Sequence, residues 1–143
     1  MTATHWTNEY VGIPYREFGR DRAGCDCWGL ACIAYAEQLG IVLPSYIGAY
    51  ASVEELAELS AHIGDVTGNG VWRLVDGLAR PFDLAVFRRG RYDTHVGVVV
   101  NPGLMLHIAA DDQAKLEHYH AGRWHHRLNG VYRHREMTSR AAR

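Results

Sequence analysis

The stretch GCDCWGL, residues 24–30, carries two of the three cysteines of this 143-residue chain and leads into the apolar segment ACIAYAEQLG, residues 31–40. Apolar residues recur at helical spacing through both segments, which predicts a helix over 26–39. Asp26 is a suitable N-cap for this helix, and Gly40 is a suitable C-terminal stop. Because apolar side chains cover most of its circumference, we expect the helix to lie in the core.

Cys27 falls in the first turn of this predicted helix. The positive end of the helix macrodipole and the unpaired N–H groups there favour a thiolate. Cys25 precedes the helix, where this effect is weaker, and Cys32 is expected to face the core, where apolar surroundings keep a thiol inert. Cys27 is therefore the candidate nucleophile, while three buried, unreactive cysteines remain the alternative interpretation.

The cysteine count and the composition bound the class of protein. Three cysteines argue against a disulfide framework, and one intervening residue is too short a spacing for an unstrained bridge between Cys25 and Cys27, so we expect reduced thiols. A length of 143 residues with 48% apolar residues indicates one globular domain, which we assign to residues 1–135, with a disordered tail at 136–143.

The second half of the chain is rich in predicted strands. Turn residues separate five apolar runs, at 83–89, 94–100, 104–110, 115–120 and 131–135. Helices are expected before them, at 4–11, from the capping box at Ser52–Glu55, and over 71–79, where an irregular segment is the alternative. Helices followed by neighbouring strands indicate an α+β domain with an antiparallel sheet.

Two histidines in this strand-rich half could serve a nucleophilic cysteine. In THVGVVV, residues 94–100, strand alternation puts His95 and Gly97 on one face. The turn at 101–103 would pair this run with the next, which carries His107 at about the matching distance, so that the two rings could be cross-strand neighbours. A thiol, an imidazole and a second imidazole to orient the first make up a general catalytic triad. Either histidine alone could equally be structural.

These segments resemble, in order, the motifs of the NlpC-type cell-wall cysteine peptidases, a papain-like family. The loop and nucleophile motifs of that family are matched by Gly12, Pro14, Tyr15, Asp26, Cys27, Gly29 and Leu30, and its strand motifs by Asp83, Leu84, Phe87, His95, Val96, Gly97 and His107. Trp28 replaces the usual serine, and residues 45–80 are longer than the minimal form of the family. In its long middle segment and its paired cysteines, the chain is more similar to peptidases carried in bacteriophage tails than to secreted housekeeping hydrolases.

The resemblance implies a papain-like fold, with N-terminal helices packed on a central antiparallel sheet of five to six strands. It implies hydrolysis of an amide in the peptide stem of peptidoglycan, at the bond between D-γ-glutamate and the diamino acid. Cys27 would be the nucleophile, His95 its base and His107 the residue that orients His95. Tyr15, Asp26 and Trp28 would line the site, and the Cys27 N–H would bind the oxyanion. No cofactor is implied.

Charge, hydropathy and the N-terminal residues limit the kinds of partner that we expect for this chain. A net charge of −1 makes nucleic acid an improbable ligand, and no apolar run is long enough to span a membrane. The residues MTATHWTNEY, 1–10, resemble no secretory signal, so we expect synthesis in the cytoplasm and delivery to the cell wall by another route, such as a virion with its tail proteins. His118 and His120 form an H-x-H pair, but no ligand set is complete and we assign no metal.

Two other functions fit the same residues. One is an inactive papain-like module that binds cell wall or a phage tail partner without turnover. The other is an acyltransferase that uses the same cysteine–histidine chemistry with an amine as the acceptor. Reactivity of the thiol would separate the first from a hydrolase, and the products formed with added amines would separate the second.

Overall fold

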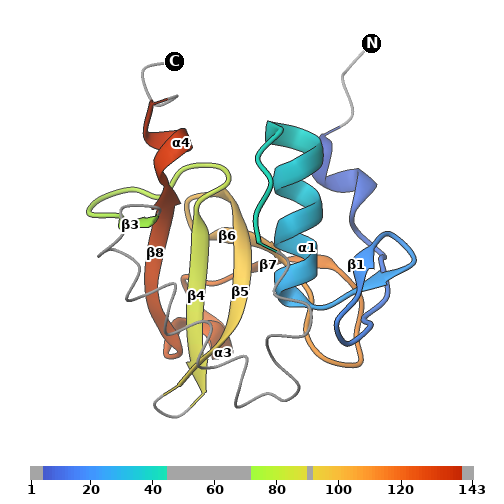
Figure 1. Cartoon of the computed structure of the whole chain (residues 1–143). Coiled ribbons are helices and arrows are strands. Elements are labelled where there is room, and N and C mark those ends of the chain that lie inside the picture. The colour runs from blue at the N-terminus through green and yellow to red at the C-terminus, as the bar shows by residue number, and fades with distance from the viewer. Residues whose placement is uncertain (1–4, 45–71, 90–91, 140–143) are drawn as a thin grey trace.

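The structure, a computed structural model, describes residues 5–44, 72–89 and 92–139, and consists of a six-stranded antiparallel sheet with one principal helix packed on it. That helix, α1 (Cys27–Ala34), contacts β5 (Tyr92–Asn101). Figure 1 shows α1 standing beside β5, with the N-terminal segment on the outer side of the helix. The predicted α+β class with an antiparallel sheet is confirmed.

The N-terminal segment holds the start of α1. A 3₁₀ turn, η1 (Trp6–Glu9), stands where a short helix was predicted. The stretch predicted as loop contains a small hairpin of β1 (Arg20–Asp21) and β2 (Gly24–Cys25). The helix α1 then continues as a π-helical turn, η2 (Tyr35–Leu39), which ends at Gly40 with φ of 69°. The helix predicted over 26–39, with Asp26 as its N-cap, is thus confirmed.

The sheet has the strand order β3-β8-β4-β5-β6-β7. Besides β5, its strands are β3 (Trp72–Leu74), β4 (Leu84–Arg89), β6 (Leu104–His107), β7 (Lys115–His118) and β8 (Leu128–His134). Two short helices flank β8 in the sequence, α3 (Gly122–His125) before it and α4 (Arg135–Ser139) after it. Every pairing in this sheet is antiparallel, and the five predicted runs each contain one strand.

The sixth strand, β3, stands where a helix or an irregular segment was expected over 71–79. The helix prediction is wrong because Trp72 pairs with His134 and Leu74 with Tyr132 at the edge of the sheet. Trp72 is buried, whereas Leu74 is exposed. An apolar pattern this short fits a helix as well as a strand, and the partner strand, 60 residues further on, decides between them.

The two faces of the sheet carry separate cores. Strand alternation puts Val96 and Val98 of β5 on the face that packs against α1, in one cluster with Cys27. Val99 lies in a second cluster, on the other face, together with Trp124 of α3. Odd-numbered and even-numbered residues of β5 therefore belong to different cores, which decides where each side chain of the site points.

Some predictions concern residues outside or at the edge of the described ranges. The helix expected from Ser52 lies in 45–71, outside the described residues, as does most of the long middle segment, 45–80, that favours a phage tail relative. Of the tail expected to be disordered, residues 136–139 belong to α4, and 140–143 are not described. Among the described helices, none combines the length and apolar character needed to cross a membrane.

Candidate active site

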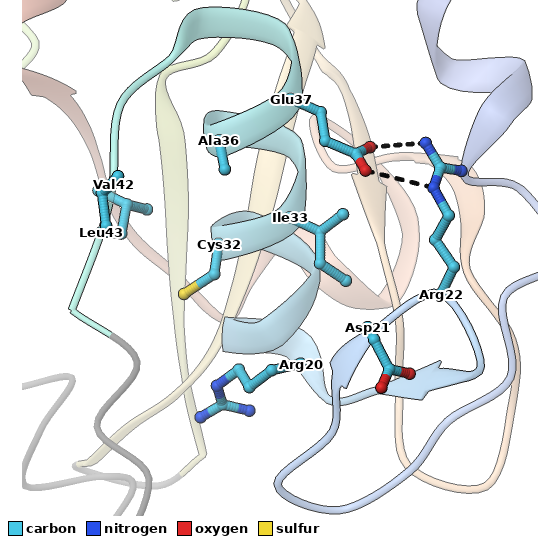
Figure 2. Close-up of a pocket in the computed structure, with 9 residues that line it drawn as sticks. All are labelled: Arg20, Asp21, Arg22, Cys32, Ile33, Ala36, Glu37, Val42 and Leu43. Carbon is cyan, nitrogen blue, oxygen red and sulfur yellow. Dashed lines mark hydrogen bonds and ion pairs between the residues drawn. The ribbon is translucent and has the colours of Figure 1, made fainter.

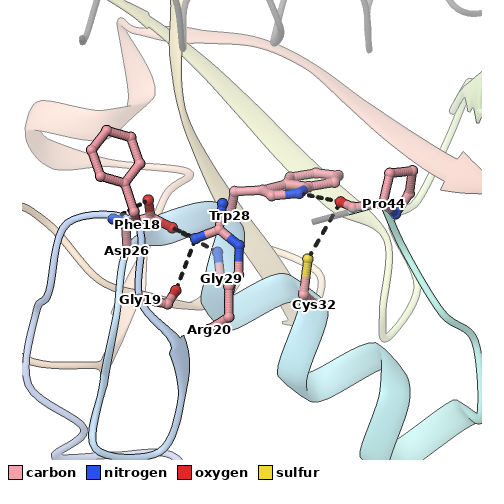
Figure 3. A network of polar contacts seen from close by, with 8 residues as sticks. All are labelled: Phe18, Gly19, Arg20, Asp26, Trp28, Gly29, Cys32 and Pro44. Carbon is pink, nitrogen blue, oxygen red and sulfur yellow. Dashed lines mark hydrogen bonds and ion pairs between the residues drawn. The ribbon is translucent and has the colours of Figure 1, made fainter. Parts of the chain in front are cut away.

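Asp26 fixes the start of α1. Its carboxylate is 1% exposed and accepts hydrogen bonds from the backbone N–H of Gly29 at 2.8 Å, the backbone N–H of Phe18 at 3.1 Å and Nη1 of Arg20 at 2.8 Å (Figure 3). This one side chain caps the helix and ties it to the preceding hairpin. Asp26, which was expected to line the site, is buried and lies near Cys27, where its charge raises the pKa of the thiol.

Trp28 is also buried, at 3% exposure, and lies in the core cluster of α1. Its indole N–H donates to the carbonyl oxygen of Pro44 at 2.7 Å, and the thiol of Cys32 lies 3.7 Å from the same oxygen (Figure 3). The tryptophan that replaces the usual serine thus holds the chain beyond η2 against the first turn of α1.

Cys27 is 8% exposed and meets the sheet at β5. The backbone N–H groups of Val96 and Trp28 lie near its sulfur and lower the pKa of the thiol. Burial, with the neighbouring Asp26 carboxylate, nevertheless raises the pKa of this thiol to about 12, and the two N–H groups only reduce the shift. Burial therefore opposes the thiolate that the helix terminus favours, an effect that the sequence analysis did not consider.

The other two cysteines have similarly raised pKa values. Burial raises the pKa of Cys25 to about 12 and that of Cys32 to about 11. All three, which lie in the described part of the chain, are free thiols. Acidity therefore does not distinguish them. What distinguishes Cys27 is its place at the start of α1, near the backbone N–H of Val96, the residue that follows His95.

His95 and His107 are joined by a buried hydrogen bond of 2.8 Å, between Nε2 of His95 and Nδ1 of His107. Val98 pairs with Leu106, so His95 lies diagonally across from His107 on the same face of the sheet. The chain of contacts continues from Nε2 of His107 to Oε1 of Glu117, on β7, at 2.8 Å. The predicted neighbourhood of the two histidines is present in the structure.

Trp124, on α3, covers this hydrogen-bonded chain. Its ring stacks on His95 with centroids 4.7 Å apart and meets His107 edge-on at 5.1 Å. The guanidinium groups of Arg123 and Arg127 lie over the indole at 5.1 and 4.6 Å. His95 is 7% exposed and His107 is fully buried as a result. Water is thereby kept from the bond between the two histidines.

The thiol and the imidazole reach β5 from different sides. The His95 ring lies on the Trp124 face, whereas Cys27 approaches from α1, and among the described residues no hydrogen bond joins the sulfur to the ring. β6 ends at His107, so it no longer pairs with β5 at Val96. The sulfur therefore lies near the stretch of β5 that β6 leaves unpaired, at the residue that follows His95.

Tyr15 lies beside the same sulfur. Its backbone N–H donates to Asp112 at 2.9 Å, and a β-bridge joins it to Cys25, so the loop that carries it is held against the start of α1. Burial raises the pKa of Tyr15 to about 12, and negative charge on Asp26 or Cys27 adds to the shift because the phenol is near both. That Tyr15 lines the site stays a prediction.

A separate cavity of about 490 Å³ runs along the outer side of α1. Figure 2 shows Cys32 and Ile33 of the helix on one side of it and Arg20 of the hairpin below. Arg22 and Glu37, which also line the cavity, form an ion pair of 2.6 Å. Neither Cys27 nor His95 lines this cavity, so it is distinct from the thiol–imidazole site.

Comparison with known proteins connects this geometry to a family. The sequence profile of the NlpC/P60 family matches residues 12–133. The chain belongs to the NlpC/P60 family. It is 26% identical over 125 residues to the murein DD-endopeptidase MepS/murein LD-carboxypeptidase of Escherichia coli K12, an alignment that covers 87% of this chain and 57% of the relative. The chain thus spans little more than half the length of the curated relatives that it matches.

Solved NlpC/P60 structures share the fold. An NlpC/P60 family protein from Bacillus cereus superposes with a TM-score of 0.63 at 22% identity, over 87% of this chain and 36% of that one. The NlpC/P60 domain of the peptidoglycan hydrolase SagA gives a TM-score of 0.59 at 19% identity, over 89% of this chain and 92% of that domain. Both the predicted family and the predicted fold are confirmed.

The structure adds Glu117 and Trp124, which the sequence analysis missed. In the run 115–120, the rings of His118 and His120 lie 5.2 Å apart. Glu117 alternates with them and therefore points to the other face, toward His107. Strand alternation indicates that face, but only the register of β6 against β7 brings Glu117 to His107. Across the described ranges, no group of three or more potential metal ligands is gathered.

The two buried histidines predict a loss of stability in mild acid. Burial lowers the pKa of His95 well below 6.5, as do the charges of His107, Arg127 and Arg123, and burial also lowers the pKa of His107 against the opposing effect of Glu117. Below about pH 6.5 the unfolded chain therefore binds protons that the folded chain does not, and the free energy of unfolding falls by up to about 1.4 kcal/mol per pH unit for each histidine.

Calorimetric melting between pH 7.5 and 5 is expected to show this fall. His95→Gln should flatten the dependence of the melting temperature on pH, since one of the two groups no longer titrates in the unfolded chain. An unchanged slope in that variant would contradict the assignment.

Proposed function

We propose that this NlpC/P60 domain is a cysteine hydrolase that cleaves an amide bond in the peptide stem of bacterial peptidoglycan. One observation carries the proposal: the Cys27 sulfur lies near the backbone N–H of Val96, the residue that follows His95, and His95 is hydrogen-bonded to a second histidine. A cysteine nucleophile and an oriented imidazole are the groups that acyl transfer through cysteine requires. The E. coli relative, named for murein DD-endopeptidase and LD-carboxypeptidase activities, supports the substrate class.

The proposed reaction begins from a neutral pair. Because burial keeps the pKa of His95 well below its ordinary value and raises that of Cys27, thiol and imidazole are both uncharged at neutral pH. His95 takes the thiol proton as the sulfur attacks the carbonyl carbon, and it later gives that proton to the leaving amine. A thioester is formed, and water attacks it with His95 again as the base, releasing the carboxylate and the free thiol.

The carbonyl oxygen needs a donor as it gains charge. The backbone N–H of Cys27 stands at the first position of α1, where a helix leaves N–H groups without intrahelical partners. It is the proposed oxyanion donor, a role whose loss typically costs about 3 kcal/mol in the transition state. Tyr15 lies near the same sulfur and is proposed to contact the substrate there.

The bond proposed is that between D-γ-glutamate and the diamino acid. Digestion of purified peptidoglycan by this chain, with mass spectrometry of the new termini, tests the proposal. We expect a free α-amino group on the diamino acid and a free γ-carboxylate on glutamate. New reducing ends of sugars without new peptide termini would overturn it.

A second candidate bond follows from the name of the E. coli relative, which specifies DD-endopeptidase action. Cleavage of a crosslink between a D-amino acid and the neighbouring stem would free an amino group on the side chain of the diamino acid instead. The same mass spectra distinguish the two bonds. Binding to peptidoglycan without release of peptide would favour an inactive module, and transfer to an added amine would favour an acyltransferase.

A further inference from the structure

The chain of contacts at the site does not stop at the second histidine. Oε1 of Glu117 lies 2.8 Å from Nε2 of His107, and Nδ1 of His107 lies 2.8 Å from Nε2 of His95. The three side chains come from three adjacent strands, β7, β6 and β5. They all project to the Trp124 face, because Met105, next but one to His107, pairs with Glu117 across β6 and β7.

Hydrogen-bond chemistry permits one arrangement of protons along this chain when both rings are neutral. An ionised carboxylate can only accept, so His107 must carry its proton on Nε2. Nδ1 of His107 is then bare and accepts, so His95 must donate from Nε2. A neutral imidazole has one N–H, which leaves Nδ1 of His95 without a proton.

We propose that Glu117 is a positioning residue of this site, which fixes the tautomers of both histidines and leaves Nδ1 of His95 as the proton acceptor for Cys27. This inference rests on the proposed cysteine hydrolase and deepens it. The role parallels a carboxylate that holds a catalytic imidazole in one tautomer and balances the imidazolium formed during reaction.

The surroundings of Glu117 suit the ionised form. Burial opposes ionisation, but the hydrogen bond with His107 and the nearby indole N–H of Trp124 outweigh it, so the pKa of this carboxyl is lowered. Arg123 lies 4.0 Å from the other carboxylate oxygen, and Lys115 adds positive charge. The Trp124 N–H is buried and meets no acceptor at hydrogen-bond geometry among the described residues, so its effect on Glu117 is one of proximity. The carboxylate is 29% exposed, so solvent can also reach it.

Long-range ¹H–¹⁵N correlation spectra of the histidine rings in the full chain at pH 7 test the proposal. In the wild type we expect both His95 and His107 to carry the proton on Nε2. Glu117→Ala removes the acceptor, and we expect mixed tautomers of His95 and a kcat lower by about 10- to 100-fold with little change in KM. Glu117→Gln keeps an acceptor oxygen and should fall between the two. His118→Gln, on the exposed face of the same strand, is the matched control and should change neither the spectrum nor kcat.

The outcomes separate this proposal from the proposed function. A wild-type spectrum with the His95 proton on Nδ1 would overturn the role of Glu117, even if Glu117→Ala failed to fold. So would an active wild type whose tautomers and kcat survive Glu117→Ala. If the wild type cleaves no peptidoglycan but its tautomers shift in Glu117→Ala, the hydrolase assignment fails and the role of Glu117 in orienting the histidines stands.

Discussion

Cys27→Ala is expected to lower the rate of peptide release from peptidoglycan by at least about 1,000-fold while the fold survives. Cys27 is the proposed nucleophile, and its sulfur lies near the backbone N–H of Val96, the residue that follows His95. The substitution removes one sulfur atom from a side chain that is 8% exposed, so we expect the protein to remain folded, with a loss of about 1 kcal/mol in stability.

Cys25→Ala and Cys32→Ala are the matched controls for this experiment. Cys25 is fully buried in the hairpin before the helix, and Cys32 faces Pro44 on the outer side of α1. Both variants are expected to retain kcat once corrected for the folded fraction, measured by circular dichroism. Activity that persists in Cys27→Ala and disappears in Cys25→Ala would move the nucleophile to the hairpin.

Arg133→Ala is expected to give the largest loss of stability of any exchange considered, about 3–5 kcal/mol. Arg133 binds Asp83 through two parallel hydrogen bonds, from Nε to Oδ1 at 2.9 Å and from Nη2 to Oδ2 at 2.8 Å. Asp83 is 1% exposed and, besides Arg133, accepts from the backbone N–H of Arg80. Removing the guanidinium leaves a buried carboxylate without its counter-ion, which is the costly half of an ion pair.

Chemical denaturation by urea, followed by circular dichroism, measures this loss. The double variant Asp83→Asn with Arg133→Met should recover part of the loss, because it leaves no buried charge unpaired. Arg135→Ala, an exposed arginine two residues away, is the control and should change the free energy of unfolding little. If Arg133→Ala were as stable as this control, the ion pair would be a surface contact rather than a support of the sheet.

The local elements of the fold were accessible from the sequence. Asp26 before an apolar segment with helical spacing predicted both α1 and its cap, because an N-cap interaction spans only three residues. Turn residues between apolar runs predicted five strands in the same way. β3 was missed because its pairing with β8 joins residues that are about 60 positions apart, which no local pattern records.

In the candidate site, too, contacts set by local patterns were predicted and contacts set by tertiary structure were missed. Strand alternation and a short turn predicted that His95 and His107 would be neighbours, since both rules act over a few residues. Glu117 was missed because its contact with His107 depends on the register of β6 against β7. The raised pKa of Cys27 was not predicted because a helix terminus can be recognised in a sequence, whereas burial against a sheet cannot.

The amino-acid sequence by itself determined the family, the capped helix that begins at Cys27, five of the strands and the identity of the three groups proposed to act together. Each of these depends on residue type and short spacing. Tertiary structure alone decided that burial raises the pKa of the Cys27 thiol, that Trp124 covers the histidine pair and that a carboxylate from β7 closes the chain of hydrogen bonds. These follow from dielectric surroundings and strand register, which arise only when distant segments pack together.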